Sequence, residues 1–143
     1  MPKKSKTGKK GKVKLDKHTL LAKQKKRDIL SEIKETENVD RIVELTWNQD
    51  DEIRLKAVQE LCPCKVQKDI DEFWNRLFQL VEDPCDEIRL QVLHNLCDGS
   101  PPHLEYRIKE ALDIFNSDSN KEIRRKAHKA LGSYLRTGDW NVL

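Results

Sequence analysis

The four cysteines and two of the histidines are the residues of this chain best suited to bind a metal ion. The ligand types of a zinc site are present in Cys62, Cys64, Cys85, Cys97, His94 and His103. Their spacing differs from the common zinc knuckles, which pair Cys-x-x-Cys with a second such pair or with His-x-x-x-His. Cys62 and Cys97 also occupy the same place in a repeated sequence, where the third copy has Gly132. We therefore interpret them as small residues packed at a helix end and expect no metal and no cofactor.

The remaining residue patterns do not predict catalysis. The sequence has no Ser-His-Asp grouping, no glycine-rich loop of the kind that holds phosphates, and no His-Glu pair typical of metal-dependent hydrolases. We expect that the protein is not an enzyme.

Three similar segments follow one another at a spacing of 35 residues. They read "DEIRLKAVQELC" at 51–62, "DEIRLQVLHNLC" at 86–97 and "KEIRRKAHKALG" at 121–132. Each has apolar residues at i, i+4 and i+8, which predicts a helix with one buried face. An apolar segment and a turn rich in Asp, Asn, Ser or Pro precede each copy, so the pattern predicts a helix pair three times over. The predicted core residues are Ile42, Leu45, Ile53, Ala57, Val58, Leu61, Leu77, Leu80, Ile88, Val92, Leu93, Leu96, Leu112, Phe115, Ile123, Ala127 and Leu131.

Helix pairs of this kind bury their apolar faces by stacking on one another, and about three are needed for a stable structure. We predict an all-α fold, a short α-solenoid of three stacked helix pairs at about 38–62, 69–97 and 103–136, within a region 37–143 that ends in a C-terminal tail. A helix over 16–36, with Asp16 as its N-cap, would flank and cap the stack. The Lys-rich arm, residues 1–15, is predicted to be disordered because it has almost no apolar residues to bury.

The repeat resembles the HEAT-repeat family of α-solenoids over about residues 38–135. The family pattern has an Asp six residues before an Arg, then a small residue and a Leu three and seven residues after that Arg. It matches here as Asp83, Arg89, Val92 and Leu96, as Asp118, Arg124, Ala127 and Leu131, and, with Asn in place of Asp, as Asn48, Arg54, Ala57 and Leu61. The resemblance implies a structural ladder in which the Asp of one repeat pairs with the Arg of a neighbour. Helical geometry agrees, because each Arg follows a core Ile by about 100° and a charge at the core edge needs a partner. Direct contact of these arginines with a ligand is the alternative.

The concave face formed by the second helices, on their side opposite the core, is the predicted partner-binding surface, as the resemblance to HEAT proteins also implies. Its candidate residues are Leu55, Lys56, Gln59, Leu90, Gln91, His94, Arg125, Lys126 and Lys129. An apolar step flanked by polar groups suits a partner helix or extended peptide, but Leu55 and Leu90 could equally pack sideways on adjacent repeats. Trp47 has two readings as well, as a residue packed under the preceding helix or as an exposed anchor for a partner. Trp74 lies in an apolar segment and is interpreted as core.

Charge is distributed unevenly along the chain. Residues 1–27 contain 12 Lys and Arg and one acid, whereas the rest has a balance of −8. The candidate phosphate-binding residues of the arm are Lys3, Lys4, Lys6, Lys9, Lys10, Lys12 and Lys14. A basic arm of this kind is typical of polyanion binding, of nuclear import and of solubilising tails. It has no aromatic residue, so stacking on bases is not expected.

These features favour a non-enzymatic adaptor or scaffold that binds a protein or peptide on the second-helix face. The alternative is a nucleic-acid-binding protein whose arm and basic third repeat contact phosphates together. We expect a monomer that resides inside the cell, in the nucleus or cytoplasm, with its thiols reduced. No apolar run has the length to span a membrane, and no apolar segment follows the N-terminal charges as it would in a secretory signal.

Overall fold

The computed structural model describes residues 11–143, so the predictions made for residues 1–10 lie outside the described part. Within it the chain is all-α, as predicted: seven α-helices and two 3-10 helices, with no strand between residues 11 and 143. The helices are α1 (Lys17–Glu35), α2 (Val39–Leu45), α3 (Asp51–Glu60), α4 (Asp71–Gln79), η1 (Leu80–Glu82), α5 (Asp86–Leu96), η2 (Pro102–Leu104), α6 (Glu105–Phe115) and α7 (Lys121–Thr137).

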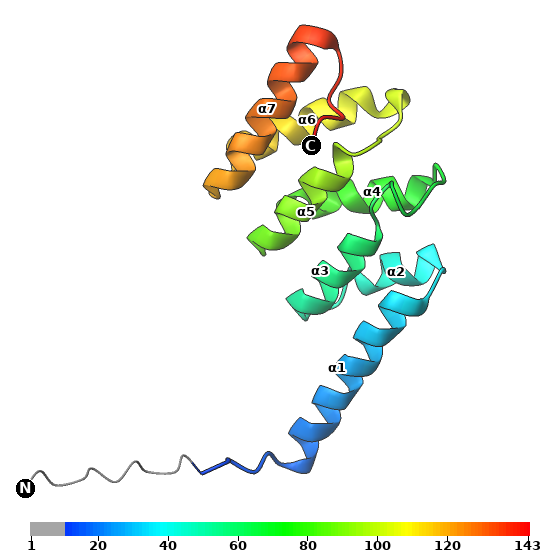
Figure 1. Cartoon of the computed structure of the whole chain (residues 1–143), viewed down its shortest axis with the longest axis vertical. Helices are drawn as coiled ribbons and strands as arrows, with labels where there is room; N and C mark the ends of the chain where they lie inside the picture. The colour runs from blue at the N-terminus through cyan, green and yellow to red at the C-terminus, as the bar shows by residue number, and fades with distance from the viewer. Residues whose placement is uncertain (1–10) are drawn as a thin grey trace, which may run out of the picture.

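The helices form two layers, as Figure 1 shows. One layer contains α1, α3, α5 and α7, in which α3 contacts α1 and α5, and α5 contacts α7. In the other layer α2 contacts α4, and η1 contacts α6. The three helix pairs are α2 with α3, α4 and η1 with α5, and α6 with α7. The layer of α1, α3, α5 and α7 contains the second helix of each pair, so we name it the second-helix layer. It positions the candidate sites described below.

Local sequence explains where the helices of this layer begin. Asp16 accepts a hydrogen bond from the amide of Thr19 at the start of α1. Asp50 caps α3 through the amides of Glu52 and Ile53, and Asn120 caps α7 in the same way. These side chains satisfy amides that a helix leaves without partners in its first turn.

One continuous core joins the layers. All the predicted core residues are buried except Leu131, which is half-buried, and Trp74 is buried as predicted. α1 joins this core only through its second half, because Ile33 is buried and Ile29 and Leu30 are partly buried, while Leu20 and Leu21 are exposed. Figure 1 shows the first half of α1 projecting away from the rest of the layer.

Residues 11–16 are exposed and have no regular secondary structure. In the part of the chain that the structure describes, no helix combines the length and the apolar character that crossing a membrane requires.

Candidate macromolecule-binding surface

Arginines on the second helices connect consecutive repeats. Arg54 Nε lies 3.1 Å from Asp83 Oδ2, and Arg89 Nε lies 2.8 Å from Asp118 Oδ2. The second nitrogen of each guanidinium donates to the other carboxylate oxygen, at 3.2 Å and 3.0 Å, so both pairs are bidentate. The four side chains are between 5% and 13% exposed. These two pairs are called the arginine ladder below.

Each ladder arginine also donates hydrogen bonds to the turn that precedes the second helix of its own repeat. Arg54 Nη1 donates to the carbonyls of Asn48 and Gln49, and Arg89 Nη1 donates to that of Asp83. Asp83 and Asp118 in turn accept the amide two residues ahead of them, in the manner of an Asx turn. The ladder therefore holds together both the repeats and the turns that start the second helices.

The two ends of the ladder differ from its middle. Asn48 keeps the Asx-turn bond, to the amide of Asp50, but it has no charge. Arg124 donates to the carbonyls of Asp118 and Ser119, and no carboxylate between residues 11 and 143 forms an ion pair with it. A neutral residue at this half-buried place is physically reasonable, because a carboxylate there without a cation would be costly.

The charges of the ladder shift one another's protonation equilibria in the direction expected of ion pairs. Hydrogen bonds from Arg89 lower the pKa of Asp118 below its usual value. Hydrogen bonds to Asp83 and Asp118 raise the pKa values of Arg54 and Arg89, respectively. Each of these shifts favours the charged form of its group.

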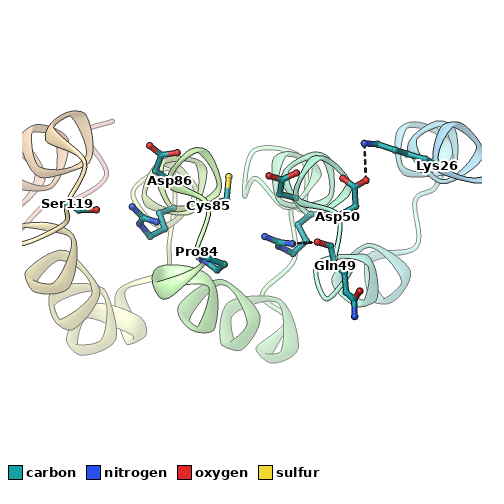
Figure 2. A pocket seen from close by; sticks show the side chains of 10 residues that line it. Lys26, Gln49, Asp50, Pro84, Cys85, Asp86 and Ser119 are labelled. Carbon is teal, nitrogen blue, oxygen red and sulfur yellow. Dashed lines mark hydrogen bonds and ion pairs between the residues drawn. The ribbon is translucent and has the colours of Figure 1, made fainter. Parts of the chain in front are cut away.

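An open groove of about 800 Å³ runs along the same edge of the second-helix layer. Its lining comes from all four helices of the layer or the turns before them: Lys26, Gln49, Asp50, Asp51, Arg54, Pro84, Cys85, Asp86, Arg89 and Ser119. Figure 2 shows Lys26 reaching from α1 to Asp50, with Cys85 and Asp86 at the start of α5. Lys26 Nζ lies 2.9 Å from Asp50 and 2.6 Å from Glu52, which raises the pKa of the lysine. We name this feature the helix-start groove.

The predicted partner-binding residues fall into two classes of exposure. Leu55, Lys56 and Gln59 on α3 are half-buried, as are Leu90, Gln91 and His94 on α5. Leu55 and Leu90 pack against the core. Gln91 donates to Asn95 on its own helix. Only the members on α7, namely Arg125, Lys126 and Lys129, are exposed, because α7 is the last helix of the layer.

The basic residues lie at opposite ends of the layer. Lys12 and Lys14 are exposed ahead of α1, whereas Lys3, Lys4, Lys6, Lys9 and Lys10 lie outside the described residues. At the other end an open hollow of about 520 Å³ is lined by Asn116, Lys121, Arg124, Arg125 and His128. Because α3 and α5 separate α1 from α7, and packed helices are about 8–10 Å apart, the two basic regions are roughly 25–30 Å apart.

Trp47 is 63% exposed, so the prediction that it packs under the preceding helix is wrong. The guanidinium of Arg76, on α4, lies 3.5 Å from the centre of its ring. Arg76 itself is buried and donates to the side chain and carbonyl of Thr46 and to Gln79. Burial lowers the pKa of Arg76. The sequence alone does not predict this contact. Arg76 lies in an apolar helix, and tertiary packing decides which side of that helix faces Trp47.

Three of the six candidate metal ligands lie together, and the other three lie apart from them. Cys62, Cys64 and His94 meet at the C-terminal ends of α3 and α5, together with Asp98, which the spacing of Cys and His alone does not single out. Cys85 lies at the opposite end of α5, and His103 pairs with Asp69. Cys97 is buried in the core, and burial raises its pKa to about 12, as expected of a packing residue.

No protein-family model, curated protein or solved structure matches this chain. The functional argument consequently depends on the residues and the geometry given above.

Proposed function

We propose that this protein is a non-enzymatic adaptor of the HEAT-like α-solenoid type, and that it binds another protein on the second-helix layer. The solenoid part of the proposal is supported by the two-layer stack, the 35-residue repeat and the arginine ladder between consecutive repeats. A layer held in this way presents side chains from successive helices at fixed spacing, which suits the recognition of an extended or helical segment.

The helix-start groove is the observation that carries the proposal of protein binding. It is open and takes its lining from the four helices of one layer or the turns before them, whereas small-molecule sites are concave, mostly apolar and close around the ligand. An extended polypeptide fits such a groove better than a small molecule does.

The charges at the groove indicate what the bound segment should contain. Arg54, Arg89 and Lys26 are already paired with carboxylates of the protein itself. Apart from the carboxylates of these pairs, the first turns of α3 and α5 carry the exposed acids Asp51, Asp86 and Glu87. We infer that the partner contributes an extended segment with Lys or Arg side chains opposite these acids.

Nucleic-acid binding is the second candidate, favoured by the exposed basic residues of α7 and by the Lys-rich arm. Phosphates bound by both regions at once would have to cross the starts of α3 and α5, where the exposed acids would repel them. The geometry therefore supports separate contacts by the arm or by α7 better than one continuous track, and it ranks this function below protein binding.

The test is affinity capture from a lysate of the source cells with the intact chain as bait, followed by measurement of binding to the purified partner. The matched variant replaces Lys3, Lys4, Lys6, Lys9, Lys10, Lys12 and Lys14 by Gln. It is preferable to a truncation at residue 28, which would remove half of α1 and the ion pairs of Lys26.

Adaptor function predicts that a protein partner remains bound after nuclease treatment and in the arm variant, with weak dependence on salt. Loss of all capture with nuclease or in the arm variant, and a fall in affinity of several hundredfold or more between about 50 and 200 mM salt, would instead establish the nucleic-acid function.

A further inference from the structure

The C-terminal ends of α3 and α5 bring together a set of side chains that the proposed binding function does not use. The thiol of Cys62 donates to Asp98 Oδ2 at 3.2 Å, and His94 Nε2 lies 3.5 Å from the same oxygen. The ligand atoms of these three residues all lie within 4.8 Å of one another. Cys64 Sγ contacts Cys62 Sγ at 2.6 Å. One sulfur, an imidazole nitrogen and a carboxylate oxygen therefore lie in one place, and the sulfur of Cys64 contacts that of Cys62 beside them.

The backbone explains why these residues meet. Cys62 directly follows the C-cap of α3, and its carbonyl accepts the amides of Lys65 and Val66, so Pro63 and Cys64 form the middle of a tight turn. The buried side chain of Asn95 donates to the carbonyls of Val58 and Leu61, which fixes the end of α5 against the end of α3.

From this docked position, α5 presents His94 in its last turn, and Asp98 directly follows the C-cap of the helix. Tertiary packing, and not sequence spacing, assembles the cluster.

We propose that Cys62, Cys64, His94 and Asp98 bind a Zn²⁺ ion that clamps the ends of α3 and α5 together. Zn²⁺ takes thiolate, imidazole and carboxylate ligands in a tetrahedron with bonds of about 2.0–2.3 Å, so its ligand atoms lie about 3.3–3.8 Å apart. The contacts of Cys62 and His94 with Asp98 are already close to this separation. Cys64 is exposed on the turn, and its sulfur lies 2.6 Å from that of Cys62, so metal binding requires the Cys64 side chain to move to a ligand spacing.

A nucleophilic cysteine is a poorer account of the same residues. In a Cys-His-Asp arrangement the imidazole lies between the thiol and the carboxylate and takes the proton of the thiol. Here the carboxylate of Asp98 lies between them, and Cys62 is buried beneath the turn. A metal ion would have all four side chains as ligands, whereas acid-base chemistry would give Cys64 no role.

The equivalent place between the second and third repeats supports a specific role for the cluster. There, 35 residues further on, the chain has Cys97, Gly99, Lys129 and Ser133 in place of the four ligands. That junction is closed by the C-terminal tail, where Asn141 Oδ1 accepts the amides of Gly99 and Ser100, and Trp140 Nε1 donates to Ser100. Each junction thus has its own closure at the helix ends, and only the first has metal ligands.

The test is the zinc content of the intact protein, purified under reducing conditions without chelator, together with the absorption spectrum of the Co²⁺-substituted form. We expect one Zn²⁺ per chain and thiolate-to-cobalt charge-transfer bands. Cys64→Ser and His94→Gln should weaken zinc binding at least about 100-fold, since even outer partners of metal ligands contribute 10–100-fold. Cys64→Ser should also halve the charge-transfer intensity, because that intensity follows the number of thiolate ligands.

Cys85→Ser and His103→Gln are the matched controls, since they remove a cysteine and a histidine that lie away from the cluster. Both should bind zinc as the unaltered protein does, with unchanged helical circular dichroism in every variant. The proposal is overturned if the reduced protein takes up no Zn²⁺, or if the control variants lose as much affinity as the cluster variants. It is equally overturned if the protein as isolated contains a Cys62–Cys64 disulfide and binds no metal after reduction.

Discussion

Replacing Arg89 by alanine removes the arginine that joins the second repeat to the third. The side chain makes two charged hydrogen bonds to Asp118, at 2.8 Å and 3.0 Å, and one to the carbonyl of Asp83 at 2.9 Å. Arg89→Ala leaves the carboxylate of Asp118, which is 7% exposed, without its cation. Breaking a buried pair from one side costs about 3–5 kcal/mol, and the residual exposure here places the loss in unfolding free energy near 3 kcal/mol.

The assay is thermal and urea unfolding followed by circular dichroism, and the expected fall in Tm is about 10 °C for a chain of this size. Arg124→Ala is the matched control, because Arg124 has the same place in the third repeat but donates only to two carbonyls. Its loss should cost about 1 kcal/mol. Adding Asp118→Asn to Arg89→Ala should recover part of the stability, because it removes the uncompensated charge and keeps the acceptor for the amide of Asn120. Equal effects of Arg89→Ala and Arg124→Ala would refute the reasoning.

Three further outcomes follow from the structure. The pKa of Asp118 is lower in the folded than in the unfolded protein. The contribution of Asp118 to the free energy of unfolding is therefore complete above the unfolded pKa of about 3.9 and is lost as pH falls through the folded pKa. Urea unfolding at pH 7, 5 and 3 should show this loss, and Arg89→Ala should make the loss smaller. Arg76→Ala should lower the unfolding free energy by about 2–3 kcal/mol because it removes buried hydrogen bonds to Thr46, whereas Trp47→Ala, at an exposed site, should cost under about 1 kcal/mol in the same assay. Trp140→Ala should cost about 3–4 kcal/mol, because the ring is buried against the second junction, and a Tm within 2 °C of the unaltered protein would contradict that role for the tail.

Much of the helical organisation can be read from the sequence, because the apolar residues at i, i+4 and i+8 alternate with Asp- and Asn-rich turns. Ile53, Ile88 and Ile123 are buried as their spacing predicts. The positions of the ladder arginines follow from the same periodicity, since each Arg comes directly after one of these core residues, whereas their pairing with Asp83 and Asp118 is expected from the resemblance to HEAT repeats. These features are local or repeated, so a single sequence is enough to expect them.

The features that sequence reasoning missed all depend on how helices pack. Periodicity in α1 includes Leu20 and Leu21 among its apolar residues, but only the second half of that helix has a neighbour to cover it. Arg76 reaches back across 30 residues to Thr46, and Asn95 caps a helix in the preceding repeat.

The cluster of proposed metal ligands also depends on how the helices pack. Asp98 joins Cys62 and His94 only because α3 and α5 end at the same edge, and no spacing rule for zinc motifs contains that information.

The central claim, that the second-helix layer binds a protein partner, is tested most directly by the affinity of the identified, purified partner for two variants of the intact chain. One variant, Asp51→Lys with Asp86→Lys, reverses two exposed acids that line the helix-start groove. The other, Tyr106→Ser with Glu110→Lys, changes two exposed residues of α6, in the opposite layer. The account predicts that the groove variant binds at least about tenfold more weakly while the α6 variant binds as the unaltered protein does. Unchanged affinity in the groove variant, or an equal loss in both, would contradict it.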